Sequence, residues 1–209
     1  RLLLERGAFV DVRNYGGTLP LFCASSLGYT DIVRVLLEHG ASVDEQGPAA
    51  NTPLHAASAK GDADIVRLLL GHGAAVSRQN DDGATALHDA IRHGHAAVVR
   101  LLLERGASPN LQTRTGTTPL HHACAGGSAD VVRLLLHHGA SADLCDGAGD
   151  SPLIRASRQG HVDIARLLLE RGASATHKNN AGVAVIMHAI ERKQTAVLRL
   201  LLQHGALLE

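Results

Sequence analysis

The sequence contains no tryptophan, and aromatic residues make up only 2% of its 209 residues. A chain that is 45% hydrophobic must therefore build its core from Leu, Val, Ile and Ala. Such side chains suit thin layers of closely approaching helices and do not require one large central core. No apolar run is long enough to cross a bilayer, so we expect no membrane insertion.

An excess of charge of either sign is also missing. Lys and Arg number 20, Asp and Glu number 20, and the formal net charge is zero. Because sequence-independent binding of nucleic acid needs a marked basic excess, we expect no nucleic-acid partner. The three cysteines are odd in number, which excludes a complete disulfide framework and favours a reducing location, cytoplasmic or nuclear.

Motifs of catalysis and cofactor binding are absent from the sequence as well. It contains no C-x-x-C, no H-E-x-x-H and no glycine-rich phosphate loop. No nucleophile stands out beside a general base. We therefore expect no catalytic residue, no metal site and no cofactor, and we do not expect the chain to be an enzyme.

The sequence does contain a repeat, with a period of 33 residues and no insertion or deletion. Clear copies of a Thr-Pro-Leu-His pattern begin at Thr52, Thr85, Thr118 and Ser151. Fainter copies lie around Pro20 and Val185. A period of this size indicates a solenoid of stacked supersecondary units.

One copy shows what each unit contains. Thr52, followed by a proline, is a good N-cap, so a short helix is expected to begin there. His55 stands three residues after Thr52 and can reach back to it as in a capping box. Gly61 permits the turn into a second helix through residues 64–70. The polar segment 74–84 has no helical period and predicts a hairpin-like connection.

Helix, turn, helix and hairpin at this period, with the Thr-Pro-Leu-His motif, resemble the ankyrin repeat over the whole chain. Glycines in register extend the resemblance. The hairpin glycines are Gly17, Gly83, Gly116, Gly149 and Gly182, and the glycines between helices are Gly28, Gly61, Gly94, Gly127 and Gly160. The resemblance implies an all-α solenoid of stacked helix-turn-helix units with hairpin-like connecting loops.

We expect residues 1–209 to form a single ankyrin-repeat array. The full repeats are expected at 14–46, 47–79, 80–112, 113–145 and 146–178, with a partial repeat at 1–13 and a degenerate repeat at 179–209. In the last repeat Lys193 replaces the inter-helix glycine, so this repeat is expected to fray first. The incomplete first repeat and the apolar last helix favour an excerpt of a longer chain.

Fourteen histidines could suggest a metal site, but the repeat explains half of them. Three support the helix caps and four precede the glycine that closes the second helix, where a cation suits the helix dipole. They are His55, His88 and His121, and His39, His72, His138 and His204. One arginine per repeat, with acidic residues three before or four after it, predicts ion pairs on a solvated outer face.

The resemblance implies that a partner protein binds the hairpin tips and the exposed side of each first helix, which form a groove. Side chains at these positions change from copy to copy, as recognition of one partner requires, although an unused surface would also vary. We expect partner contacts at Tyr15, Lys60, Asp81, Asp82, Arg92, His93, Arg114, Arg158, Gln159 and Asn180.

Two features of that groove are the strongest candidates. Tyr15 lies on a hairpin tip, where an aromatic anchor would be accessible, whereas Phe9 and Phe22 are expected to fill the core. Further along, the acidic pair Asp81 and Asp82 is expected to face a basic run and to orient a charged peptide. That run consists of Arg92, His93, Arg114 and Arg158.

The sequence therefore predicts a monomeric protein-interaction scaffold or adaptor that binds a segment of another protein. An alternative remains open: the array could be the targeting or regulatory region of a larger enzyme, channel or ubiquitin-ligase adaptor.

Overall fold

A computed structural model describes residues 9–206, so the expected partial helix at residues 1–8 and the final residues 207–209 lie outside it. Within the described residues the secondary structure is helical, apart from one isolated antiparallel bridge between Lys178 and Ala184. The all-α class is confirmed. The chain divides into two compact units, residues 1–108 and 109–209, which we describe separately.

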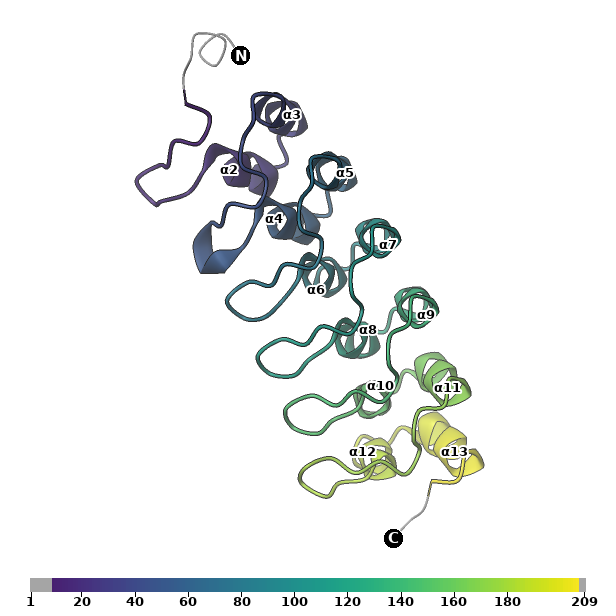
Figure 1. The fold of residues 1–209 in the computed structure, drawn as a ribbon. Helices are drawn as coiled ribbons and strands as arrows, with labels where there is room; N and C mark the ends of the chain where they lie inside the picture. Colours follow the sequence, from purple (N-terminus) through teal and green to yellow (C-terminus); the bar gives the residue numbers. More distant parts are fainter. Residues whose placement is uncertain (1–8, 207–209) are drawn as a thin grey trace. The chain divides into compact units, whose positions relative to one another are not determined.

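The first unit contains three helix pairs joined by hairpin-like loops (Figure 1). The first helices α2, α4 and α6 pack side by side, and the second helices α3, α5 and α7 form a parallel row. Their bounds are α2 Pro20–Leu27, α3 Thr30–Glu38, α4 Pro53–Lys60, α5 Ala63–Gly71, α6 Ala86–Arg92 and α7 Ala96–Glu104, with a 3₁₀ turn η1 at Pro48–Ala50.

The second unit repeats this arrangement with three further pairs (Figure 1). Here α10 packs between α8 and α12, and α11 packs between α9 and α13. The bounds are α8 Pro119–Gly126, α9 Ala129–His137, α10 Pro152–Gln159, α11 Val162–Glu170, α12 Val185–Glu191 and α13 Thr195–Gln203.

The first helices begin where the capping pattern predicts. Thr52 caps α4, and the ring of His55 completes a capping box in which its Nδ1 accepts the Thr52 N–H at 3.2 Å. The same box forms at Thr85 and Thr118. Leu19 has no side-chain hydroxyl, and the start of α2 accordingly has no side-chain cap.

The capping histidines also connect neighbouring repeats. His55 Nε2 donates to the Ala84 carbonyl at 3.1 Å, and His121 Nε2 donates to the Asp150 carbonyl at 2.9 Å. Burial lowers the pKa of both rings, against the opposing effect of these backbone hydrogen bonds. Each ring is therefore neutral near pH 7, with Nε2 as its donor.

A second connection, which the sequence reading did not anticipate, follows each second helix. A polar side chain accepts the backbone N–H of a residue 31 positions later in the next repeat, as Asp44 does from Ala75 at 3.0 Å. The acceptors within residues 9–206 are Asp11, Asp44, Ser77, Asn110 and Asp143. These bonds satisfy backbone donors at the segments that lead into the hairpins.

Asparagine and aspartate side chains hold the hairpins closed. Asn80 Oδ1 accepts the backbone N–H groups of Asp82 at 3.0 Å and Ala84 at 2.9 Å. Asn14, Asp146 and Asn179 make the same pair of bonds in their own repeats. This local bonding pattern forms the turn without a β-ladder.

The two phenylalanines expected in the core behave differently. Phe22 is half-buried on α2, but Phe9 is 86% exposed, so core filling is the wrong interpretation for Phe9. Positions one to five periods after Phe9 hold only small residues: Ser42, Ala75, Ser108, Ser141 and Ser174. None of these five positions is buried, so a larger side chain in this column remains in solvent.

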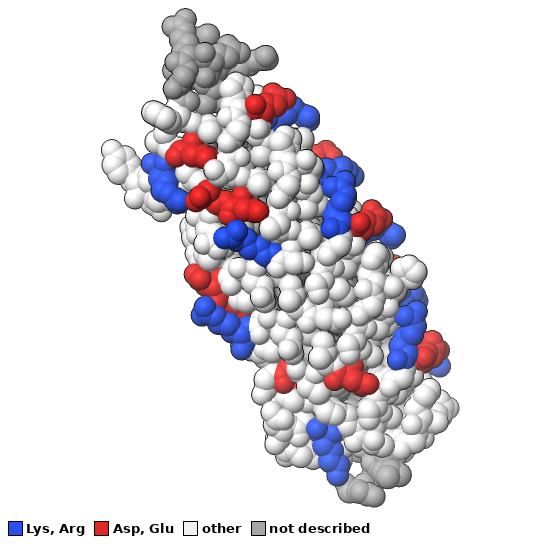
Figure 2. Space-filling view, viewed as in Figure 1, with Lys and Arg blue, Asp and Glu red and all other residues white. Residues whose placement is uncertain are grey.

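Charged side chains lie along the second helices, which carry the exposed arginine column. Figure 2 shows basic and acidic patches along this edge. Arg67 pairs with Asp64, and Arg133 pairs with Asp130 at 2.6 Å. Within residues 9–206 the other expected pairs on this face do not come within contact distance. The solvated outer face is confirmed, but most of its expected ion pairs are not formed.

Three histidines at the ends of the second helices, His39, His72 and His204, bind backbone carbonyls. Nδ1 of His39 lies 2.8 Å from the Val35 carbonyl, and Nδ1 of His72 lies 2.8 Å from that of Leu68. His204 makes the equivalent bond to Leu200. The rings therefore satisfy carbonyls that the last helical turn leaves free.

Lys193 adopts the left-handed conformation, with φ of 56°, that glycine adopts between the helices of five other repeats. Because a side chain in this region costs about 1–2 kcal/mol, we predict that Lys193→Gly raises the free energy of unfolding by about 1 kcal/mol. Urea denaturation measures the gain. Lys178→Gly, at an exposed position outside this conformation, is the control and should give no gain.

Candidate functional site

The predicted partner-contact residues occupy two kinds of position. Tyr15, Asp81, Asp82, Arg114 and Asn180 lie in hairpin turns, and Lys60, Arg92, His93, Arg158 and Gln159 lie at the ends of first helices. All are exposed except Arg158, which is half-buried. Tyr15 in particular has a fully exposed side chain.

Backbone hydrogen bonds connect successive hairpin tips within each unit. In the first unit the Asp81 N–H donates to the Ala49 carbonyl at 3.0 Å. In the second, Gly147 donates to Thr115 at 2.8 Å and Asn180 donates to Ala148 at 3.0 Å. The tips that these bonds join are therefore held at fixed spacing, whereas the tip that carries Tyr15 makes no such bond within the described residues of its unit.

A depression lies between the hairpins and the first helices of the first unit. It encloses about 210 Å³, less than the roughly 300–1,000 Å³ of pockets for small molecules. Its lining comes from α2, α4, α6 and the adjoining loops: Phe22, Asn51, His55, Ala56, Ala59, Asn80, Asp82, Asp89 and Arg92. A space of this size suits one side chain of a partner.

Asp89 is the most unusual residue of this depression. It belongs to α6, is only 9% exposed, and makes no side-chain ion pair within the described residues of the first unit. Burial raises its pKa to about 6, with a further upward contribution from Asp82, against the opposing charges of Arg92 and His93. A desolvated carboxylate at the surface of a groove is characteristic of functional sites.

We predict that Asp89→Asn stabilises the protein at pH 7. The folded state raises this pKa, so Asp89 favours folding below its ordinary value of 3.8 and loses that contribution as the pH rises through about 6. One pKa unit corresponds to about 1.4 kcal/mol, and partial solvation in the open depression reduces the effect, so we expect a gain of about 1–2 kcal/mol.

The measurement is urea unfolding of Asp89→Asn and wild type between pH 4 and pH 8. The gain should become small at pH 4, where the folded wild type binds the proton and the unfolded chain, with the ordinary pKa of 3.8, is partly protonated. Asp81→Asn, on the exposed neighbouring tip, is the matched control and should change stability little. A loss of stability at pH 7 in Asp89→Asn would contradict the prediction.

Two buried carboxylates also face the groove in the second unit, but each has a guanidinium partner. Asp146 is bound by Arg155, and Asp150 is bound by Arg158 at 3.0 Å with Arg155 Nε 3.7 Å away. Burial raises the pKa of Asp146, but the bond from Arg155 and backbone N–H groups outweigh burial and hold the pKa below its usual value. Asp146 is therefore charged near pH 7.

Intramolecular contacts restrict three of the predicted contact residues. Arg158 is bound to Asp150, the Lys60 stem lies against Gly28, and His93 Nδ1 bonds the Asp89 carbonyl oxygen at 2.9 Å. Arg114 and Gln159 make no polar side-chain contact within the described residues of their own unit. The mixed-charge stretch is present in the first unit, where Asp82 and Arg92 line one depression. Its expected extension to Arg114 and Arg158 stays a prediction.

The sequence reading missed one column of the groove. It follows the capping histidine and contains Cys23, Ala56, Asp89, His122, Arg155 and His188. Asp89 and His188 are buried, and Arg155 is half-buried. The available signal was a change from apolar to ionisable residues at one position of otherwise apolar helices, a change that packing alone does not require.

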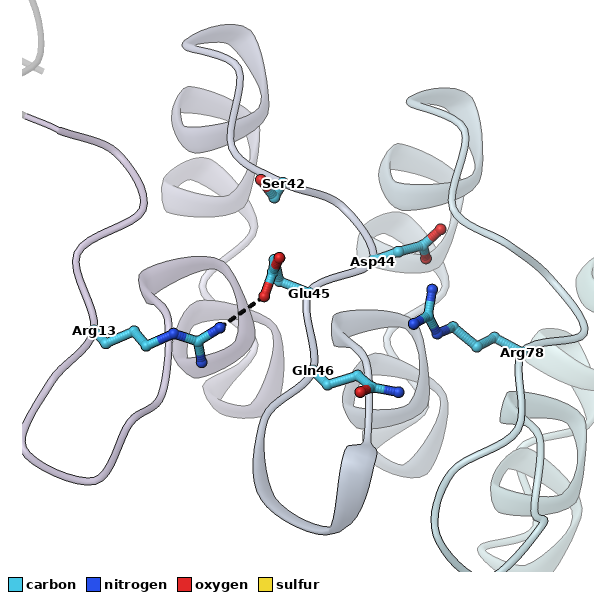
Figure 3. Close-up of a pocket in the computed structure, with 6 residues that line it drawn as sticks. All are labelled: Arg13, Ser42, Asp44, Glu45, Gln46 and Arg78. Atoms are coloured by element: carbon cyan, nitrogen blue, oxygen red, sulfur yellow. Dashed lines mark hydrogen bonds and ion pairs between the residues drawn. The ribbon is translucent and has the colours of Figure 1, made fainter.

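A second depression of the first unit lies on the loops that follow the second helices. Figure 3 shows Arg13 and Arg78 reaching from two hairpins toward the segment between them, which carries Asp44 and Glu45. Arg13 pairs with Glu45 at 2.7 Å, and both side chains remain about half exposed. These charges are solvated, and Asp44 already accepts a backbone N–H. A bound ligand would therefore stabilise the charges of this depression less than it would stabilise Asp89.

Chemistry other than binding has little support in the described residues. Burial raises the pKa of the Cys124 and Cys145 thiols, which disfavours the reactive thiolate. Residues 9–206 contain no group of three or more potential metal ligands and no helix with the length and hydrophobicity of a membrane span.

Comparisons with known proteins agree with this architecture. A family model described as "Ankyrin repeats (3 copies)" matches residues 43–113 and 106–180, and one described as "Ankyrin repeat" matches residues 16–48. Among solved structures, the crystal structure of the ankyrin repeat domain of Bcl-3, a member of the IkappaB protein family, matches with a TM-score of 0.82 at 32% identity. The match covers 95% of this chain and 89% of that chain. No curated protein matched in sequence.

Proposed function

Because the chain belongs to the ankyrin-repeat family, we propose that it is a protein-interaction module whose hairpin tips and first-helix ends bind a segment of a partner protein. The supporting observation is the exposed, copy-specific set of side chains on hairpins that backbone bonds hold at fixed spacing. A rigid surface of this kind binds without the entropic cost of ordering loops.

The proposal includes a role as a scaffold or adaptor in the cytoplasm or nucleus, acting as a monomeric array. The supporting features are the three unpaired cysteines and the absence of catalytic or cofactor motifs from the sequence. The same surface would serve a larger enzyme, channel or ubiquitin-ligase adaptor as its targeting or regulatory region.

The test is affinity capture with the wild type and two pairs of variants. One groove variant carries Tyr15→Ala and Arg92→Ala in the first unit, and the other carries Arg114→Ala and Asn180→Ala in the second. One control variant carries Arg67→Ala and Arg100→Ala in the first unit, and the other carries Arg133→Ala and Arg166→Ala in the second. All control substitutions lie on the outer face. Arg158 is left intact because its removal would strand Asp150.

We expect the control variants to retain the partner that the wild type captures and at least one groove variant to lose it. Truncating an interface anchor costs at least about 2 kcal/mol, which corresponds to an affinity loss of about 30-fold or more. Retention of the same proteins by both groove variants, with loss in the outer-face controls, would place the interface on the second helices.

A further inference from the structure

We propose that the depression at Asp89 binds the guanidinium of one arginine side chain from an extended partner segment. This inference rests on the proposed function and specifies the chemistry of one position of the partner. It places the charged end of the arginine against the Asp89 carboxylate and its aliphatic stem against Phe22.

The first argument is the lack of a partner for a buried carboxylate. Asp89 is 9% exposed and lines the depression. Within the described residues of the first unit its side chain forms no ion pair, and the bond from His93 goes to its backbone carbonyl. A carboxylate removed from water without a partner destabilises the folded protein, and a bound cation relieves that cost.

The second argument is the shape of the depression. The α4 residues of the lining are His55, Ala56 and Ala59, and the two alanine columns hold Arg155 and Arg158 in α10 of the second unit. The short alanine side chains leave a space that an external side chain can fill. Phe22 on α2 adds an aromatic surface, which suits the stem and the planar end of an arginine.

The third argument comes from the second unit, where the protein satisfies its own groove carboxylates. Asp146 and Asp150 are nearly inaccessible, and both are bound by guanidinium groups from Arg155 and Arg158. Arginine rather than lysine is used at both positions, as expected where a planar donor matches a carboxylate. Asp89 has the burial of these carboxylates but lacks the intramolecular arginine.

The charge of the lining agrees with a cationic ligand. It contains two carboxylates, Asp82 and Asp89, against one guanidinium, Arg92, which gives a net charge of −1. His55 adds no charge near pH 7 because burial lowers its pKa. Arg92 shares the depression but closes no ion pair with Asp89, so it limits the site to one additional cation.

The test uses random 12-residue peptides displayed on phage and selected against the full chain. Parallel selections use Asp89→Asn, which preserves shape and is expected to fold at least as stably as the wild type, and Asp64→Asn as the control acid on the outer face. The strongest wild-type peptide is then synthesised with its shared arginine intact or replaced by Lys or Gln. Fluorescence anisotropy gives its affinity for each protein at pH 7.

We expect wild type and Asp64→Asn to select peptides that share an arginine, and Asp89→Asn to lose that preference. Replacing the arginine by Gln should weaken binding to the wild type at least 10-fold and should have little further effect on Asp89→Asn. Lys at the same position should recover part of the affinity. This pattern would establish direct coupling between the arginine and Asp89.

Two outcomes would overturn the inference. If selected peptides bind the groove and respond to Tyr15→Ala or Arg92→Ala, but share no arginine or ignore Asp89→Asn, the interaction module stands and the arginine site is wrong. If the wild type selects no peptide in repeated rounds, the site and the binding of extended segments at this groove both fail.

Discussion

Replacing Arg155 by methionine should lower the free energy of unfolding by about 3 kcal/mol at pH 7. Methionine keeps much of the side-chain volume but removes the guanidinium, so Asp146 stays buried with no cation and Asp150 keeps only Arg158. Breaking a buried ion pair costs about 3–5 kcal/mol, and the lower end applies because Arg155 is itself 33% exposed. Urea or guanidinium denaturation measures the loss.

Two further variants separate charge from packing. Arg155→Met combined with Asp146→Asn should recover most of the stability, because asparagine already closes the equivalent hairpin at Asn80. Arg166→Met, on the outer face, should change it by less than about 0.5 kcal/mol. The native pKa of Asp146 is lowered, so its favourable contribution exists above pH 3.8 and disappears as the pH falls through the native value. The defect of Arg155→Met should shrink accordingly in acid.

Replacing His121 by alanine is the second change with a large expected effect. The ring accepts the Thr118 N–H at 3.2 Å and donates to the Asp150 carbonyl of the next repeat, and it is almost fully buried. Its removal leaves the buried Thr118 N–H without a partner, which costs about 1–3 kcal/mol, takes one of two donors from the Asp150 carbonyl, which keeps the Asp146 N–H at 3.0 Å, and adds a cavity. We expect a loss of about 3–4 kcal/mol in denaturant unfolding.

The control for this prediction is His138→Ala, in which a half-buried ring at the end of α9 is removed. Its effect should stay below about 1 kcal/mol. Burial lowers the pKa of His121, so the contribution of the neutral ring exists above pH 6.5 and is lost as the pH falls through the native pKa. Wild-type stability should therefore decline below pH 6.5, and His121→Ala should decline less. Equal losses in the two alanine variants would refute this role of the ring.

Helix positions in this chain follow from local chemistry, which explains why the sequence predicts them well. Thr52 and His55 form the capping box that their spacing predicts, and α4 begins at Pro53. Gly61 takes the left-handed conformation that ends this helix. These features depend on residues within one turn of each other, so a single copy of the repeat contains the necessary information.

The candidate site was less accessible to sequence reasoning because its properties depend on neighbouring copies. The depression at Asp89 is lined by Phe22 two copies earlier and by Ala56 one copy earlier, so it depends on which residues those copies hold. The exposure of a tip residue such as Tyr15 can be predicted from its position in the repeat. The pairing of Arg158 with Asp150 cannot, because it depends on which residues occupy two different positions of the repeat. Reading columns for charge against their apolar surroundings would have found Asp89 and Arg155.

The side-chain bonds between repeats explain why the chain keeps one strict length per copy. Asp44 reaches the N–H of a residue 31 positions ahead, and His121 reaches the carbonyl of a residue 29 positions ahead. Adding or removing a single residue between donor and acceptor would displace both ends of such a bond, whereas gaining or losing an entire copy would leave every remaining pair in place. Evolutionary change in chain length should therefore occur in steps of a whole unit, and duplication of a copy should be tolerated where a one-residue insertion is not.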